Sequence, residues 1–142
     1  MYFDRMDTLL QILRTVDERQ FRMETWGVNF NDDGDVLKDS CGFAGCAMGW
    51  AAQSPYFQKL GLRLRRCATA LRPLYVTRLV FHGPDGIELD GFLAAAAVFG
   101  ITADAAKCLF DPEAYDDTPD VIIKPKHVIA RIEDFMRQQV SA

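Results

Sequence analysis

Apolar residues recur at helical spacing in several segments of the chain, and these segments predict helices separated by polar turns. The recurrence over Thr8–Val16, with Asp7 as N-cap, is typical of an amphipathic helix. Glu18–Trp26 is expected to form a second short helix that ends at Gly27. Toward the C-terminus the pattern predicts three further helices, at Gly91–Phe99, Ala103–Phe110 and Pro125–Gln139.

Capping residues mark the ends of two of these helices. Asp90 and Thr102 stand just before a helical segment, where a short side-chain oxygen can accept a free backbone N–H. Gly100 follows Phe99 in the position that favours a left-handed glycine. An acidic loop, 111–120, is expected before the last helix.

Alternation of apolar and polar residues predicts a small sheet in the middle of the chain. Leu62–Arg65 and Pro73–His82 read as strands, and Gly83–Gly86 has the composition of a turn. Ile87–Leu89 is expected to pair back across that turn. Tyr56 and Phe57 precede the sheet and are expected in the core, on a short helix or loop that Gly61 closes. The predicted fold is α+β and mainly helical, with about five helices and a small antiparallel hairpin or three-stranded sheet.

The segment from Ser40 to Ala52 is rich in small residues. We expect a helix here with Ser40 or Cys41 at its N-cap. Each glycine costs ~1 kcal/mol relative to alanine inside a helix, so the glycines favour a site of close approach. Four small residues would share one face of this helix, the packing stripe: Gly42, Gly45, Gly49 and Ala52. The sequence therefore predicts a buried central helix.

Length and charge narrow the range of partners. The 142 residues suit a single domain, 1–142, and the net charge of −4 gives no general attraction for nucleic acid or an anionic membrane. The longest apolar segment, Phe92–Phe99, is far shorter than the ~20 residues that span a bilayer. The first residues show no signal-peptide pattern. We expect a cytoplasmic protein without membrane contact, and the oligomeric state stays open.

One combination of residues could support nucleophilic catalysis. A thiol at a helix N-terminus, as expected for Cys41, has its thiolate stabilised by the helix dipole. His82 would be the base, with Asp85 or Asp90 as the carboxylate that orients it. The local sequence around Cys41 matches no signature of papain-like enzymes. The competing interpretation is that Cys41 caps or packs and that His82 lies beside a turn.

Metal and cofactor sites are not expected. Cys41 and Cys46 are five residues apart, whereas structural zinc sites use closer cysteine pairs. Cys46, Cys67 and Cys108 are expected to be small buried residues. The polar loop Asn29–Asp39 lacks the glycine and the glutamate of an EF-hand at the required positions, which favours a simple loop.

Two segments could contact a macromolecule. Residues 96–109 resemble a helix-turn-helix, but the second helix offers one lysine among nearby acids, which disfavours DNA. Five arginines on the predicted sheet form the only basic patch: Arg63, Arg65, Arg66, Arg72 and Arg78. They are either a contact surface for a phosphate backbone or an acidic partner, or a solvated face paired with the acidic loops 31–39 and 111–120.

The stretch Cys41–Ala51 resembles a C-G-T-x-x-C-A-x-G-x-A pattern of small uncharacterised bacterial and bacteriophage proteins. Those proteins also carry steps similar to Phe99–Thr102 and Leu109–Pro112, and a closing segment similar to Thr118-Pro119, Val128 and Arg131-Ile132. This chain departs from them at Phe43, where threonine is frequent, and by extra residues at 120–125. The resemblance spans roughly residues 8 to 140. It implies a compact, mainly helical domain and supplies no activity.

Taken together, the sequence favours a non-enzymatic interaction or accessory protein, of phage or mobile-element origin, that binds another macromolecule. A protein partner is expected at the five arginines, and nucleic acid is the disfavoured alternative. The rival hypothesis is a cysteine-dependent hydrolase or transferase using Cys41 and His82.

Overall fold

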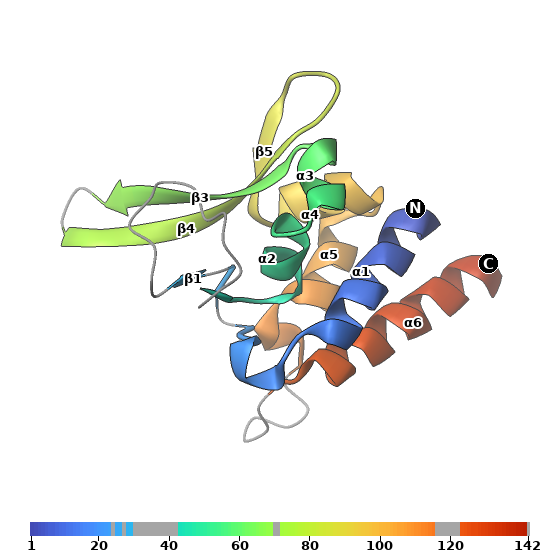
Figure 1. The fold of residues 1–142 in the computed structure, drawn as a ribbon. Helices are drawn as coiled ribbons and strands as arrows, with labels where there is room; N and C mark the ends of the chain where they lie inside the picture. The colour runs from blue at the N-terminus through green and yellow to red at the C-terminus, as the bar shows by residue number, and fades with distance from the viewer. Residues whose placement is uncertain (24, 27, 30–42, 70–71, 116–122, 142) are drawn as a thin grey trace.

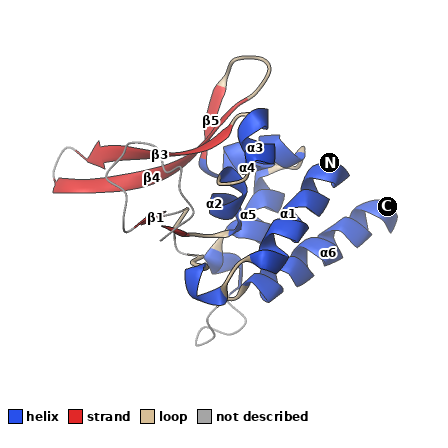
Figure 2. Cartoon of the chain, viewed as in Figure 1, coloured by secondary structure: helices blue, strands red, loops and turns tan. Residues whose placement is uncertain are grey.

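The structure is a computed structural model that describes residues 1–141 except 24, 27, 30–42, 70–71 and 116–122. For residues 28–29, 43, 66–69, 72–77 and 141 only the backbone is described. Six α-helices lie in the described part of the chain: α1 (Phe3–Thr15), α2 (Ala47–Ala52), α3 (Pro55–Leu60), α4 (Gly91–Phe99), α5 (Ala103–Phe110) and α6 (Pro125–Ser141). The helices gather on one side of the molecule and the main sheet on the other (Figure 2). The predicted α+β, mainly helical fold is confirmed.

The main sheet has three antiparallel strands in the order β3 (Leu62–Thr69), β4 (Arg72–His82) and β5 (Glu88–Asp90). The two long strands form a hairpin whose far end extends beyond the helices (Figure 1). The predicted turn before β5 is present, since the Gly86 N–H donates to the Gly83 carbonyl at 3.0 Å. A second sheet, which the sequence did not predict, pairs β1 (Val28–Asn29) with β2 (Phe43–Ala44).

Helix α1 begins five residues earlier than the expected start at Thr8. Its N-cap is Tyr2, not Asp7. Tertiary contacts account for the extra turn, because the Tyr2 N–H donates to the Phe99 carbonyl at 2.9 Å and Arg5 Nη1 donates to the Val98 carbonyl at 2.7 Å. The start of α1 therefore satisfies carbonyls that the C-terminal end of α4 leaves open.

The expected helix Glu18–Trp26 is wrong. A short 3₁₀ helix, η1 (Glu18–Gln20), is followed by extended chain that pairs with the segment before α2. The Gly45 N–H donates to the Gln20 carbonyl at 3.1 Å, and the Gly45 carbonyl accepts from the Arg22 N–H at 2.9 Å. Trp50 Nε1 also donates to the Gln20 carbonyl, at 3.1 Å. Because these backbone groups bond across chain segments, neither segment is available to continue a helix.

The small-residue segment consequently forms a much shorter helix than expected. Helix α2 starts at Ala47 with Cys46 as its N-cap, so Gly45 lies before the helix, and the packing stripe does not form one helical face. Gly42 and Cys41 lie outside the described residues. The expectation of burial holds, because Gly49 and Ala52 are buried with most of α2.

The capping signals had mixed outcomes. Thr102 caps α5 by accepting the Ala105 N–H at 3.1 Å, and Gly100 ends α4 in the left-handed region with φ of 65°. Asp90 precedes α4 but makes no capping hydrogen bond. The next residue, Gly91, has a φ of 61°, in the left-handed region, so the backbone turns there while Asp90 remains paired with Val80 of β4. Pro112–Tyr115, expected in a loop, forms a second 3₁₀ helix, η2.

The core is one cluster that draws on every α-helix and on β3 and β4. Helix α4 runs through its middle: it contacts α1, α5, β4 and β5, and most of its side chains are buried. Phe99, at the end of α4, contacts Phe57 edge to face and Phe110 at a tilt, with ring centroids 5.7 and 5.9 Å away. Phe57 of α3 is buried as expected, but Tyr56 is 40% exposed, so its expected place in the core is wrong. Val128 and Ile132 of α6 are also buried.

Arg131 joins the last three elements of the chain. From α6, its Nη1 donates to the carbonyls of Cys108 (3.0 Å) and Ala114 (2.7 Å), and its guanidinium lies 3.7 Å from the centre of the Tyr115 ring. The Tyr115 hydroxyl donates to the Leu109 carbonyl at 2.6 Å. Burial raises the pKa of Tyr115 to about 12, against the opposing effect of Arg131, so the hydroxyl stays a donor at neutral pH.

Two glycines in the left-handed region provide a matched test of the fold. At Gly61, with φ of +110°, an added Cβ would overlap the His82 carbonyl oxygen, whereas at Gly86, with φ of +77°, it would meet nothing within 4 Å. We expect Gly86→Ala to cost about 1–2 kcal/mol, from backbone strain alone. Gly61→Ala should cost about 3–5 kcal/mol, because strain and overlap add. Urea unfolding of both variants measures this, and equal losses would contradict the close contact between α3 and β4.

Candidate functional site

The sheet has one face toward the core and one away from it. Leu62, Leu64, Leu79 and Phe81 point into the core, and the residues that alternate with them form the opposite side. We call this side the outer face. In register, Arg65 lies opposite Arg78, Arg63 opposite Val80, Val80 opposite Asp90, and His82 opposite Glu88. The outer face is therefore made of these side chains: Arg63, Arg65, Arg78, Val80, His82, Glu88 and Asp90.

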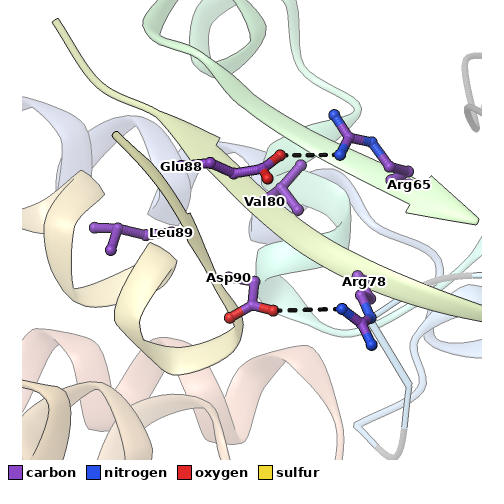
Figure 3. Close-up of a pocket in the computed structure, with 6 residues that line it drawn as sticks. All are labelled: Arg65, Arg78, Val80, Glu88, Leu89 and Asp90. Carbon is purple, nitrogen blue, oxygen red and sulfur yellow. Dashed lines mark hydrogen bonds and ion pairs between the residues drawn. The ribbon is translucent and has the colours of Figure 1, made fainter. Parts of the chain in front are cut away.

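A hollow of about 210 Å³ lies on the outer face, where β5 ends beside β4. Figure 3 shows that Arg65 and Arg78 approach it from β3 and β4, while Glu88 and Asp90 approach from β5. Val80 lies among these four charged side chains and is only 3% exposed. The stems of the charged side chains cover this valine, while their charged ends remain in contact with water.

Glu88 is the centre of one charged group on this face. Its Oε1 accepts from Arg65 Nη1 at 2.9 Å and lies 2.9 Å from His82 Nε2. The hydrogen bond with His82, and secondarily the charge of Arg65, lower the pKa of Glu88 from its ordinary value. All three side chains are substantially exposed, so these contacts position β5 more than they stabilise the fold.

Arg78 and Asp90 form a looser pair. Their closest charged atoms, Arg78 Nη1 and Asp90 Oδ2, are 3.8 Å apart, which is too long for a hydrogen bond. Both side chains are exposed, at 60% and 58%. Arg63 differs from Arg78, because its Nη1 donates to the Gln58 carbonyl at 3.1 Å.

The structure brings three of the five predicted arginines to one face. Arg63, Arg65 and Arg78 lie together on the outer face. Arg66 and Arg72 belong to β3 and β4, but their side chains lie outside the described part. The described ion pairs of Arg65 and Arg78 go to β5, and the acidic loops expected as their partners, 31–39 and 111–120, lie wholly or partly outside the described residues.

The predicted catalytic residues had a different outcome. Cys41 lies outside the described residues, so its distance from His82 stays untested. The carboxylate beside His82 is Glu88 and not Asp85 or Asp90. Asp85 is used in the turn, where its Oδ1 accepts the Ile87 N–H at 3.1 Å. Sequence reasoning missed Glu88, although pairing across the 83–86 turn, extended by one residue, would have placed it opposite His82.

The remaining cysteines are not alike. Cys46 is buried at the start of α2, as expected, whereas Cys108 on α5 is exposed and the expectation of its burial is wrong. The side chain of Cys67 is not described. Among the residues described, no three His, Cys, Asp or Glu side chains come together in a group able to hold a metal ion.

Helices α4 and α5 have the angle of a helix-turn-helix. Their axes turn by 103° at a three-residue connection, within the range of such motifs. The side chains that α5 exposes include Asp104, Lys107 and Cys108, which do not form a basic surface. The angle therefore fits a helix-turn-helix, whereas the charge of α5 does not favour DNA. Of the helices described, none is by itself long and apolar enough to cross a membrane.

A pH titration tests the charged group around Glu88. Because the pKa of Glu88 is lowered in the folded protein, its carboxylate stabilises the fold at pH values above the ordinary pKa of 4.5. This stabilisation is lost as the pH falls through the lower pKa of the folded state. We expect Glu88→Gln to lower the unfolding midpoint slightly at neutral pH and to have no effect in strong acid. Chemical denaturation at several pH values measures the difference. A wild-type carboxyl signal by NMR that titrates at or above 4.5 would contradict the arrangement.

Comparison with protein families, with curated proteins and with solved structures gives no match to this chain.

Proposed function

We propose that this protein is a non-enzymatic interaction protein and that it binds a protein partner through the outer face of the β3–β4–β5 sheet. The observation that carries the proposal is the hollow between Arg65 and Arg78, with two carboxylates on its other side. The planar guanidinium of arginine can donate two parallel hydrogen bonds to one carboxylate, and its alkyl stem covers apolar surface. Arginine is therefore enriched at protein interfaces.

The mixture of charges favours a protein over a nucleic acid. Three arginines of the outer face, Arg63, Arg65 and Arg78, stand beside Glu88 and Asp90, so the face is close to neutral. A nucleic-acid backbone repeats its negative charge along its length and requires a predominantly basic surface. The chain as a whole carries −4, which adds a further repulsive contribution. A partner of mixed charge fits this surface better.

A phage or mobile-element origin and a cytoplasmic location belong to the same proposal. They rest on the resemblance of the Cys41–Ala51 segment and on the composition of the chain.

Three arginines can be removed together to test the proposal. We expect Arg63→Ala/Arg65→Ala/Arg78→Ala to reduce partner capture on an affinity column at least tenfold, because exposed contacts are lost while the core is untouched. The matched control is Arg14→Ala/Arg19→Ala/Arg137→Ala, which removes three exposed arginines outside the sheet. It should retain capture, and both variants should unfold close to the wild-type temperature. Equal capture by the two variants would remove the outer face from the function.

The second candidate function is a cysteine-dependent hydrolase or transferase. It is favoured by the 2.9 Å contact between His82 and Glu88, because a base in such enzymes is oriented by a carboxylate. Cys41 would be the nucleophile.

Thiol labelling distinguishes the two functions. In the native protein we expect exposed Cys108 to react with iodoacetamide and buried Cys46 to react only after unfolding, so that each serves as an internal reference. The interaction function predicts that Cys41 reacts no faster than Cys108. Faster reaction of Cys41 below neutral pH, lost in His82→Ala, would support the enzyme instead. Mass spectrometry of the labelled peptides measures all the rates in one sample.

A further inference from the structure

Arg78 differs from the other arginines of the outer face in how its guanidinium is used. Arg63 donates to a carbonyl and Arg65 donates to Glu88. Within the described part of the chain, Arg78 makes no hydrogen bond, and its single ion pair, with Asp90, is 3.8 Å long. A guanidinium carries five N–H donors in a planar fork that matches a carboxylate. Arg78 therefore offers, beside the hollow, a guanidinium whose N–H donors make no hydrogen bond in the described part of the chain.

We propose that Arg78 is the primary contact for a carboxylate side chain of the partner protein, which enters the hollow on the outer face. This inference rests on the proposed function and names the chemistry of its partner. The carboxylate would accept two parallel hydrogen bonds from the guanidinium, and the stem of the partner's Asp or Glu would lie near Val80.

The local charges explain why the incoming group is an acid. Arg65 and Arg78 are directly opposite in register, which places two like charges side by side on adjacent strands. Glu88 neutralises Arg65 through a hydrogen bond of 2.9 Å, but Asp90 reaches Arg78 only at 3.8 Å. A carboxylate of the partner would give Arg78 a hydrogen-bonded acid like the one that Glu88 gives Arg65. Asp90 is exposed and makes no capping hydrogen bond, so it can turn away from Arg78 and face a basic residue of the partner.

The same charges restrict which residues of the partner can lie next to its incoming carboxylate. Glu88 and Asp90 line the hollow beside Arg78 and would repel a second or third negative charge. A single carboxylate next to a basic residue fits, because the basic residue then faces Glu88 or Asp90. A run of phosphates does not fit. The partner segment is thus one in which acidic and basic residues alternate.

Variants of Arg78 test the assignment in the capture assay. Arg78→Gln removes the charge, and we expect it to account for most of the loss seen in the triple variant, about tenfold. Arg78→Lys keeps the charge without the planar fork and should recover only part of the binding. Arg137→Gln, in an exposed ion pair on α6, is the matched control and should bind like the wild type. If the triple variant loses capture and Arg78→Gln keeps it, this inference fails while the proposed function stands.

A peptide titration tests the chemistry directly. The probe is a soluble peptide in which Glu and Lys alternate, with Thr residues on either side of them. Its binding is monitored by ¹⁵N NMR of the full chain. We expect shifts at Arg78, Val80 and Asp90, and at least tenfold weaker binding when the peptide's Glu residues become Gln. That substitution should cost nothing more in Arg78→Gln, because the contact is already absent. Equal binding by the Gln peptide, or tighter binding by a single-stranded DNA of the same length, would overturn the inference.

Discussion

The rest of the structure depends on the small side chains of α4, which allow the neighbouring elements to pack close to this helix. Ala94, Ala95 and Ala96 are buried, and Val98 and Phe99 complete a helix that has core on most of its sides. Such a helix can be surrounded only when its neighbours come close, and alanine permits this. The sheet lies on one side of α4 and the helices on the other (Figure 1). The outer face of the sheet is consequently left to charged residues.

On the outer face, the described ion pairs join strands of the same sheet. Strand β5 has only three residues, and two of them, Glu88 and Asp90, place carboxylates beside arginines of β3 and β4. The resulting surface is exposed, nearly neutral and rich in directional hydrogen-bonding groups. Individual pairs of this kind contribute little to stability in water, so the arrangement matters for what the surface can recognise.

Much of the fold could be predicted from the sequence, because the capping of α5 by Thr102 and the period of α6 are local features. The turn at Gly83–Gly86 is also a local feature, and it was predicted from its composition. The failures came from contacts between distant segments. The Gly45 backbone bonds to residues 20 and 22, which no periodicity reveals, and this shortened α2. Similarly, Glu88 was missed because its role depends on which residue of β4 lies opposite.

The start of α1 has a consequence for synthesis of the chain. Tyr2 and Arg5 donate hydrogen bonds to the carbonyls of Phe99 and Val98, more than ninety residues later, and α1 packs against α6 at the end of the chain. During translation, α1 is made before α4 and α6, so part of its apolar side stays uncovered until those two helices have been synthesised. In that interval Leu9, Leu10 and Leu13 lack part of their native packing, so the nascent chain carries apolar surface that chaperones can bind.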